Sequence, residues 1–383
     1  MRENLKKALS GLGLLELLRR GRYFATGRRA DLRFKETYIA IRKGDREIRM
    51  SPDSAENSCL PALVENFDYV HSAVVPKSVD GMTVVDFSRR QVHRLARTGT
   101  EIELAFGSDS LAIRKGHHEI RLNPSHIVYL WDLGDFFFDQ DFSAVVPEMQ
   151  NGIAVADYSR PRVHRLSHSG VAFEFPSLPE SDKSAEAYLS ALQLKPGDAV
   201  LDFGAYAGAC AYFLSRAIGP EGVIGCFEPD EITFHYLEGN IARHELSNVR
   251  AFQKGLWTET TTLAFQSEGS TGSSIVSVLG RKTNTKTIDV VNLDDAAALI
   301  GGARVAAVKM DIEGAELEVV RGAGDFLRRH QPRLVIEPHP LAGNMNTEEI
   351  CEILRSFDYH ADFVSQGVQD WPLIAASPKH RTG

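Results

Sequence analysis

Short apolar runs alternate with stretches of helical periodicity through the second half of the chain. The runs expected to form strands are Val200–Phe203, Val223–Phe227, Asn248–Gln253, Val305–Met310 and Leu334–Ile336. Helices are expected at Ala185–Leu194, Ala209–Ile218, Ile232–Arg243, Leu317–Arg329 and Thr347–Ser356. This alternation predicts an α/β fold in which a parallel sheet carries helices on both faces. Two last β-type runs, His360–Val364 and Trp371–Ala376, predict an antiparallel hairpin at the edge of that sheet.

The first half of the chain contains an internal duplication. Ile39–Gly44 recurs as Leu111–Gly116, and Val92–Leu95 recurs at nearly the same spacing as Val163–Leu166. Each copy opens with alternating residues around a Lys-Gly pair, which is a hairpin signal. We therefore expect a duplicated β-rich (α+β) region ahead of the α/β domain.

Domain boundaries follow from these patterns. Residues 1–30 are expected to form a basic amphipathic helical segment, residues 31–107 the first β-rich module and residues 108–178 the second. The α/β domain then spans residues 179–383. Its joint with the second module is expected near Pro176–Ser184, where Pro, Ser and charged residues cluster.

The strongest candidate site follows the first strand of the α/β domain. Asp202, Gly204, Tyr206 and Gly208 lie in a turn with glycines four residues apart, where side chains would block a ligand lying on the backbone. Glu228 follows the next strand, and a carboxylate there can accept hydrogen bonds from both ribose hydroxyls of a ligand. The glycines lack the GxGxxG spacing that binds a pyrophosphate, and no Lys-Ser/Thr phosphate clamp follows them. The pattern therefore favours S-adenosylmethionine over a dinucleotide or ATP.

Three further motifs in this domain resemble those of a known protein family. They are Lys309–Glu316 (Lys-Met-Asp-Ile-Glu-Gly-Ala-Glu), Val291–Asp295 and Pro332–His339. Together with Gly272–Ser274 and the glycine turn, they resemble the FkbM-type S-adenosylmethionine-dependent methyltransferases over roughly residues 178–376. The resemblance implies a Rossmann-like class I methyltransferase sheet that ends in an antiparallel hairpin. It also implies methyl transfer to an oxygen, typically a hydroxyl of a sugar or of a polyketide-type product.

Three candidate catalytic residues lie where an open α/β sheet binds its ligands, beyond the carboxyl ends of the strands. Asp311, which we also count as a cofactor-binding residue, follows Val305–Met310, and Glu337 and His339 follow Leu334–Ile336. If these strands adjoin the glycine turn, the three side chains converge where the transferred methyl would lie. His339 has the ordinary pKa of a general base near neutrality. Holding the two reactants in an attack-ready pose could instead supply much of the rate.

These residues also have purely structural interpretations. Asp311 could be the N-cap of a helix, with Glu313 and Glu316 in its first turn against the helix dipole. Lys309 is expected to flank its strand rather than react. Tyr206 is expected to pack over the cofactor rather than transfer a proton.

A metal-assisted reaction is a further alternative. A magnesium ion on Asp311 and Glu337 would lower the pKa of the acceptor hydroxyl. Magnesium prefers oxygen ligands, however, and His339 is a poor ligand for it. We therefore expect no metal at this site.

The duplicated modules carry two candidate binding features. The pair His93/Arg94 recurs as His164/Arg165, but a repeated motif more often records a shared fold than two sites. The middle segment of the second module mixes aromatic residues with aspartates, which suits a sugar face and equally fits a buried helix or a subunit contact. We expect the second module to line the acceptor pocket, with Trp131 as the residue to test.

Charge and composition narrow the class of partner. The chain has 383 residues and a formal net charge of −8, whereas a nucleic-acid surface would be basic. Basic residues surround a leucine-rich helical pattern at Leu5–Leu18, which could contact a membrane surface or a partner helix but is too short to span a bilayer. The absence of a convincing signal peptide favours a cytoplasmic location. The four cysteines have no metal-ligand spacing, and Cys210 and Cys226 are expected to be buried.

The sequence thus predicts an S-adenosylmethionine-dependent O-methyltransferase that acts on a hydroxyl of a sugar, glycan, glycolipid or polyketide-type small molecule. The alternative is a non-catalytic binding or scaffold protein that retains the methyltransferase fold. A nucleotide-dependent oxidoreductase is disfavoured by the missing dinucleotide glycine spacing. The identity of the acceptor and the oligomeric state stay open.

Overall fold

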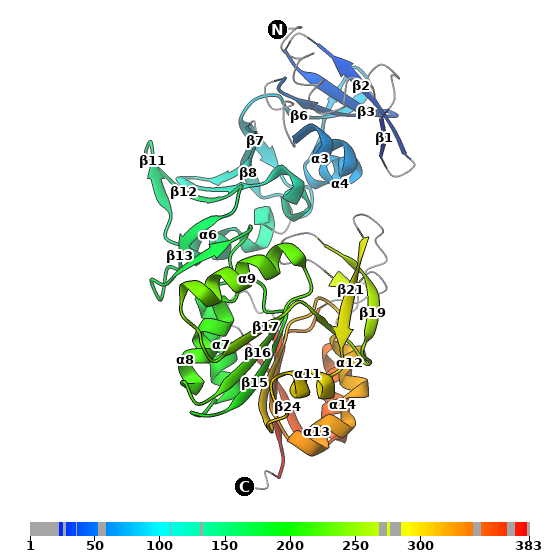
Figure 1. Ribbon diagram of the computed structural model, residues 1–383. Coiled ribbons are helices and arrows are strands. Elements are labelled where there is room, and N and C mark those ends of the chain that lie inside the picture. Colours follow the sequence, from blue (N-terminus) through cyan, green and yellow to red (C-terminus); the bar gives the residue numbers. More distant parts are fainter. Residues whose placement is uncertain are drawn as a thin grey trace. The chain divides into compact units, whose positions relative to one another are not determined.

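The computed structural model describes residues 23–25, 28–35, 37–52, 59–107, 109–130, 133–267, 274–275, 285–339, 346–365 and 372–380. It divides the chain into two compact units, residues 1–161 and 162–383 (Figure 1). The helical pattern at Leu5–Leu18 and Trp131 lie outside the described residues. Within the described part, no helix combines the length and the apolar character that a membrane span needs.

The first unit contains two six-stranded sheets that share a repeated strand arrangement. In the first sheet the order is β1 (Tyr23–Ala25), β2 (Arg28–Phe34), β3 (Ile39–Lys43), β4 (Arg46–Met50), β6 (Met82–Phe87), β5 (Lys77–Val79). In the second it is β7 (Gln91–Arg94), β8 (Glu101–Phe106), β9 (Leu111–Lys115), β10 (His118–Leu122), β12 (Ile153–Tyr158), β11 (Glu148–Gln150). The expected helical segment 1–30 is therefore wrong at its end, because β1 and the start of β2 lie in it.

Helical connections fill the middle of each module. The pairs β4–β6 and β10–β12 are parallel, and parallel strands need a crossover connection. The elements of the two crossovers are α3 (Cys59–Glu65) and α4 (Phe67–Ala73) in the first, and η2 (Pro124–Tyr129), η3 (Leu133–Phe137) and α6 (Phe138–Ala144) in the second.

Strand pairing moves the expected module boundaries. β8 pairs with β9, so the break between the two sheets precedes Gln91 instead of following residue 107. The hairpin of β13 (Arg162–Arg165) and β14 (Ala172–Phe175) carries the second copy of the motif found in β7, and it belongs to the second unit. The repeated Val-His-Arg-Leu motif thus marks the first hairpin of a sheet, whereas the expected division placed it at a module's end.

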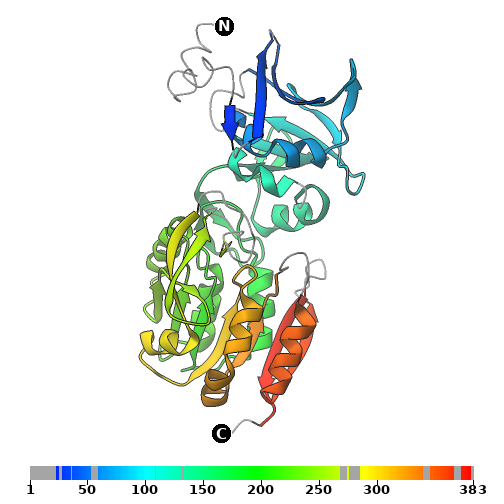
Figure 2. The ribbon, with the colours of Figure 1, turned by 90° about the vertical axis from the view of Figure 1, so that its right-hand side faces the viewer.

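A seven-stranded sheet forms the centre of the second unit (Figures 1 and 2). Its order is β17 (Val249–Phe252), β16 (Val223–Phe227), β15 (Ala199–Phe203), β22 (Val305–Met310), β23 (Arg333–Ile336), β25 (Pro372–Pro378), β24 (Tyr359–Ser365). The first five strands are parallel. β25 is antiparallel to both β23 and β24, so an antiparallel hairpin ends the sheet.

Helices cover both faces of this sheet because its central strands are apolar on both sides. Along β15, Val200 packs with Leu214 of the α8 layer, whereas Leu201 and Phe203 pack with Val320 on the opposite face. The first layer consists of α7 (Asp182–Leu192), α8 (Ala209–Ile218) and α9 (Glu231–Arg243). The second consists of α11 (Leu293–Leu299), α12 (Glu316–Gly322), α13 (Gly324–His330) and α14 (Thr347–Ser356).

Two features of this unit depart from the sequence prediction. The single helix expected at Leu317–Arg329 is two helices, α12 and α13, with a break at Ala323. A four-stranded sheet that was not predicted has the order β18 (Gly255–Leu256), β21 (Thr285–Val291), β19 (Thr261–Gln266), β20 (Ser274–Ile275). Its Phe265 packs with Ala315 of the Lys309–Glu316 motif. All four cysteines are buried free thiols, as expected for Cys210 and Cys226.

Candidate functional site

The chain turns sharply where β15 leads into α8. Gly204, Tyr206 and Gly208 have positive φ angles of 72°, 47° and 82°. A Cβ on Gly204 would lie 1.7 Å from the backbone oxygen of Asp311, and a Cβ on Gly208 would lie 2.7 Å from Leu237 Cδ1. The two glycines therefore make room for neighbouring parts of the protein; that they also clear space for a ligand stays a prediction.

Asn240 of α9 connects the glycine turn to the hairpin β13–β14. Its buried side-chain amide donates to the carbonyl oxygens of Ala207 at 2.9 Å and of Glu174 at 2.8 Å, and its Oδ1 accepts from the Glu174 N–H at 2.9 Å. The backbone of the turn is thus held from outside by a hairpin that carries the repeated motif. No pattern in the sequence indicated this role, because a lone asparagine on a helix is unremarkable.

Glu228 follows β16 and is buried against the glycine turn. Its two carboxylate oxygens accept the backbone N–H groups of Tyr206 and Asp230, each at 2.9 Å. Burial raises the pKa of Glu228 to about 7, and these hydrogen bonds oppose the shift. A carboxylate has about four acceptor sites, so Glu228 keeps capacity for ligand hydroxyls.

The side chain of Tyr206 is directed to β14 and the segment that follows it. Its hydroxyl donates to the Leu178 carbonyl oxygen at 2.8 Å, and its ring stacks on Phe175 with 6.3 Å between centroids. Packing of Tyr206 over a cofactor therefore stays a prediction.

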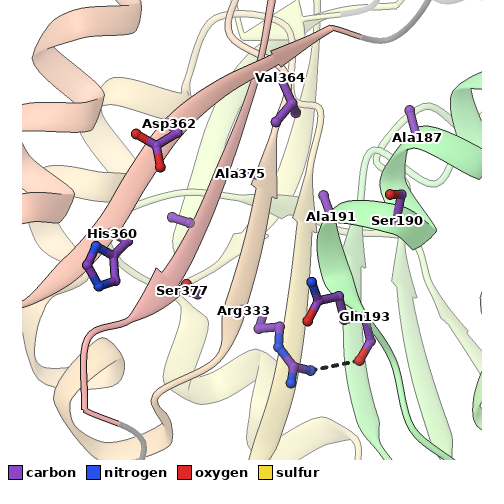
Figure 3. A pocket seen from close by; sticks show the side chains of 11 residues that line it. Ala187, Ser190, Ala191, Gln193, Arg333, His360, Asp362, Val364, Ala375 and Ser377 are labelled. Atoms are coloured by element: carbon purple, nitrogen blue, oxygen red, sulfur yellow. Dashed lines mark hydrogen bonds between the residues drawn. The ribbon is translucent and has the colours of Figure 1, made fainter.

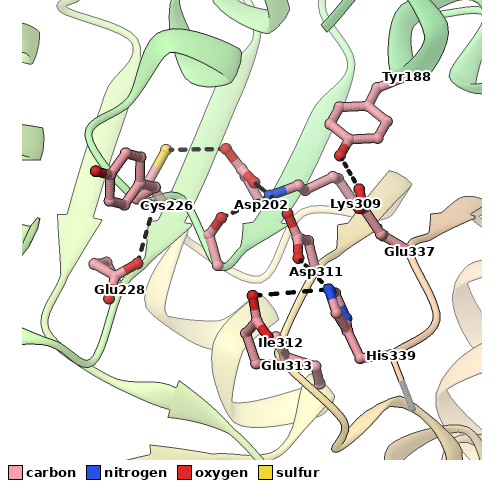
Figure 4. Close-up of polar contacts among 12 residues, drawn as sticks. Tyr188, Asp202, Cys226, Glu228, Lys309, Asp311, Ile312, Glu313, Glu337 and His339 are labelled. Atoms are coloured by element: carbon pink, nitrogen blue, oxygen red, sulfur yellow. Dashed lines mark hydrogen bonds and ion pairs between the residues drawn. The ribbon is translucent and has the colours of Figure 1, made fainter. Parts of the chain in front are cut away.

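Lys309 is a buried cation on β22, opposite Asp202 of the neighbouring strand β15 (Figure 4). Its Nζ donates to the Gly204 carbonyl oxygen at 2.6 Å and lies 3.4 Å from Asp202 Oδ1 and 3.5 Å from Asp311 Oδ2. Burial alone would lower the pKa of Lys309, but the carboxylates of Asp202 and Asp311 raise it well above its ordinary value. Burial likewise raises the pKa of Asp202, and Lys309 opposes that shift. Lys309 thus joins two predicted site residues, a role that the sequence analysis did not assign to it.

The carboxylates after β22 gather around His339. Asp311 Oδ1 and Glu313 Oε1 each lie 3.7 Å from His339 Nε2, while His339 Nδ1 donates to Glu316 Oε1 at 3.0 Å. Helix α12 begins at Glu316 with Ala315 as its cap residue, so Asp311 is not an N-cap and Glu313 is not in the first turn.

Glu316 fixes this loop and orients the imidazole. Besides His339, its Oε1 accepts the backbone N–H groups of Ile312 at 3.1 Å and Gly314 at 3.2 Å. The sequence predicted for Glu316 only a place in the first turn of a helix, so its contacts with the loop and with His339 were not expected.

The charges around His339 decide its protonation. Burial would lower the pKa of His339, but Glu313, Glu316 and Asp311 raise it well above its ordinary value. Burial also raises the pKa of Glu313 to about 8, and His339 opposes that shift. An imidazole that keeps its proton near neutrality donates hydrogen bonds. The expectation that His339 has the ordinary pKa of a general base is therefore wrong for this arrangement.

Glu337 follows β23 on the other side of Lys309. Its Oε2 accepts a hydrogen bond from the hydroxyl of Tyr188 in α7, whose ring lies 5.7 Å from Lys309 Nζ. The structure thus brings Asp202, Asp311 and Glu337 to one edge of the sheet, the carboxyl ends of β15, β22 and β23.

One group at this edge has a geometry that could hold a metal ion. Asp311, Glu313 and His339 offer ligand atoms within 4.8 Å of one another, which would give two oxygens and one nitrogen. Glu337, which the sequence analysis paired with Asp311 for this purpose, is outside the group.

A hollow of about 360 Å³ lies at the opposite end of β23 (Figure 3). Its wall includes Arg333, which donates to the Gln193 carbonyl oxygen at 2.9 Å, together with His360 and Asp362 of β24. None of the predicted site residues lines this hollow, so it is separate from the site described above.

A parallel sheet with a glycine turn after β15 and an acid after β16 places the second unit among Rossmann-like domains that bind nucleotide-type cofactors. Residues 202–361 match the family model of the methyltransferase FkbM domain. This match confirms, over these residues, the resemblance that the motifs indicated.

Individual relatives are distant. Methyltransferase 1 of Beauveria bassiana (strain ARSEF 2860) is 28% identical over 146 residues, which cover 33% of this chain and 58% of that protein. The solved structure of methyltransferase FkbM from Methylobacillus flagellatus KT is similar over 48% of this chain and 44% of that chain, with 21% identity and a TM-score of 0.36. The O-methyltransferase TomG of Streptomyces achromogenes, involved in tomaymycin synthesis and solved with S-adenosylmethionine, is similar over 53% of this chain and 82% of that chain, with 13% identity and a TM-score of 0.33. The chain thus spans less than two thirds of the curated relative.

Proposed function

We propose that this protein is an S-adenosylmethionine-dependent O-methyltransferase. The observation that carries the proposal is the arrangement at the carboxyl edge of the sheet. There Lys309 ties Asp202 on β15 to Asp311 after β22, and Glu228 stands at the end of the neighbouring strand β16. A cofactor that lies across β15 and β16 would present its reactive end to Asp311.

The residues at this edge fit the proposed cofactor. Asp202 Oδ1 is buried and accepts no hydrogen bond from any described residue, although Lys309 lies 3.4 Å away. S-adenosylmethionine carries an ammonium and a sulfonium, and both complement a site with surplus carboxylates. Gly204, Tyr206 and Gly208 would supply the backbone of the binding turn, and Glu228 would accept the ribose hydroxyls. When bound, the cofactor supplies an electrophilic methyl group.

In this proposal Asp311 receives the proton of the acceptor hydroxyl. Its side chain is 24% exposed, so a substrate can reach the carboxylate that Lys309 and His339 flank. His339 and Glu337 position the acceptor from the end of β23. Alignment of the two reactants supplies much of the rate enhancement, and we expect no metal to be required.

The acceptor class rests on the resemblance of the chain's motifs to the FkbM-type family, which implies methyl transfer to an oxygen. We infer a small molecule or glycan that presents a hydroxyl: a sugar, glycan, glycolipid or polyketide-type compound. A formal net charge of −8 argues against nucleic acid as the acceptor. The competing hypothesis is a binding or scaffold protein whose site residues serve only the fold.

Calorimetric titration with S-adenosylhomocysteine separates these hypotheses. The wild type should bind, and Glu228→Gln should weaken binding about tenfold or more, the loss expected for hydrogen bonds worth about 1–3 kcal/mol. Glu221→Gln is the matched control, because Glu221 is exposed in a turn before β16. No binding by the folded wild type would refute the methyltransferase proposal and favour the scaffold. If binding is found, transfer of a radiolabelled methyl group to sugars, glycolipids and polyketides identifies the acceptor.

A further inference from the structure

A partly buried glutamate in the segment between β14 and α7 has no role in the fold described so far. Leu178 is anchored to the glycine turn, since its carbonyl oxygen accepts the Tyr206 hydroxyl at 2.8 Å. Glu180 lies two residues further on, just before α7 begins at Asp182. Its Oε2 is buried and has no hydrogen-bond partner among the described residues. A buried acceptor without a donor costs about 1–3 kcal/mol, so such a group calls for a ligand or another explanation.

The charges that act on Glu180 are those of the proposed cofactor site. Burial raises the pKa of Glu180 to about 8; Lys309 opposes the shift, and Asp202 and Asp311 add to it. Lys309 is already engaged by Gly204, Asp202 and Asp311. Glu180 Oε2 and Asp202 Oδ1 are therefore two buried oxygens that accept no hydrogen bond from a described residue, although Lys309 Nζ lies 3.4 Å from Asp202 Oδ1.

We propose that Glu180 binds the α-ammonium group in the methionine part of the cofactor, with Asp202 as its partner on β15. This inference rests on the proposed function and assigns a ligand to a residue outside the family motifs. An ammonium has three N–H donors, enough for both orphan oxygens. A sulfonium has no N–H donor and cannot satisfy them. The ammonium is present in S-adenosylhomocysteine, so this product tests the contact without the sulfonium charge.

Two ligands that differ only at the amino-acid end give the test. S-adenosylhomocysteine and 5′-methylthioadenosine share the adenosine and the thioether, and only the first carries the ammonium and carboxylate. Calorimetry on the full-length chain should show that Glu180→Gln weakens S-adenosylhomocysteine by about tenfold or more and 5′-methylthioadenosine by less than about twofold. Glu221→Gln should change neither affinity. Glutamine preserves the shape of the protonated carboxyl, and circular dichroism verifies that the variant is folded.

The outcomes are distinguishable. An unchanged affinity of Glu180→Gln for S-adenosylhomocysteine overturns the proposal and leaves the proposed function standing. Equal weakening of both ligands also overturns it, because the effect would then lie in the adenosine site or the fold. If the wild type binds neither ligand, the proposed function and this inference fail together.

A measurement on the wild type alone guards against a variant that does not fold. A carboxyl that is protonated in the free protein must ionise when it receives an ammonium, so S-adenosylhomocysteine should release protons at pH 7. The release appears as a dependence of the binding enthalpy on the ionisation enthalpy of the buffer. It should be larger for S-adenosylhomocysteine than for 5′-methylthioadenosine, because the ribose contact with Glu228, whose pKa is about 7, is common to both ligands. The same proton release with both ligands, or with neither, contradicts the assignment of Glu180.

Discussion

Replacement of Asn240 by alanine should loosen the glycine turn from the hairpin β13–β14. The buried side chain makes three hydrogen bonds at 2.8–2.9 Å, two to the backbone of Glu174 and one to the Ala207 carbonyl. Each is worth about 0.5–1.5 kcal/mol net, and each buried backbone group left without a partner costs about 1–3 kcal/mol. The groups of Glu174 are partly buried and can recover water, so we expect a total loss of roughly 2–5 kcal/mol.

That loss is large against a domain stability of about 5–15 kcal/mol. It corresponds to a fall of roughly 1–2 M in the urea midpoint for a slope of about 2–3 kcal/mol/M. Hydrogen exchange should locate the effect, with faster exchange in residues 162–175 and in the turn 204–208. Affinity for S-adenosylhomocysteine should fall by about threefold to tenfold, or about 1 kcal/mol, because the freed Ala207 carbonyl belongs to the binding turn.

Asn248→Ala is the matched control. Asn248 also bonds a backbone carbonyl, that of Gly219 at 2.8 Å, and accepts from the Ser215 hydroxyl at 2.7 Å, but it contacts neither the glycine turn nor the hairpin through these bonds. It should lower stability without changing ligand affinity. The reasoning is refuted if Asn240→Ala leaves exchange in residues 162–175 unchanged, or if both variants alter ligand affinity equally.

Three further predictions test the backbone and the charges of the site. Gly204→Ala should destabilise the second unit by more than about 3 kcal/mol, since its Cβ would lie 1.7 Å from the backbone oxygen of Asp311. Gly197 also has a positive φ but open space around it, so Gly197→Ala should cost only about 1–3 kcal/mol in thermal denaturation. Similar losses in the two variants would contradict the close approach at Gly204. Lys309→Met should cost about 3–5 kcal/mol because it leaves the buried Asp202 and the partly exposed Asp311 without their shared cation. Adding Asp202→Asn should restore part of that loss. An unaltered urea midpoint would exclude this ion pair as a stabilising contact. Burial raises the pKa of Glu228 to about 7 and that of Glu180 to about 8, so each group contributes stability that is fully present below its ordinary pKa of 4.5 and is lost as the pH rises through the folded value. The melting temperature of Glu180→Gln should therefore fall less than that of the wild type between pH 5.5 and 8.5. Parallel pH profiles would count against the raised pKa of Glu180.

The sequence predicted the elements of the second unit where a pattern is complete within one segment. Helices Ala209–Ile218 and Thr347–Ser356 and strands Val223–Phe227 and Val305–Met310 have the expected bounds. Long apolar runs with glycine or polar ends specify such elements locally. The sheet β18–β21 was missed, because β18 and β20 have only two residues each. Strands so short exist only through their pairing and leave no periodic signal.

The candidate site could be predicted as a set of residues but not as a network. Position at the carboxyl ends of strands was enough to nominate Asp202, Asp311 and Glu337. Their partners come from distant segments. Tyr188 is 149 residues before Glu337, and Lys309 is 105 residues after Gly204, whose carbonyl oxygen accepts its hydrogen bond. The protonation of His339 depends on three such neighbours, and the ordinary pKa of an isolated imidazole could not reveal it.

The hairpin β13–β14 explains why repeat boundaries and domain boundaries disagree in this chain. In chain order it follows the second sheet as β7–β8 follows the first, and it carries the second copy of the Val-His-Arg-Leu motif. The edge of β8 that does not face β7 pairs with β9, the next strand of the same sheet. In the described part of the chain, no strand equivalent to β9 pairs with β14. The backbone N–H and carbonyl of Glu174 are bonded instead by the side chain of Asn240 on α9. Because backbone groups must find partners somewhere, the edge of this hairpin depends on α9 of the second unit, and the same asparagine connects it to the glycine turn through the Ala207 carbonyl.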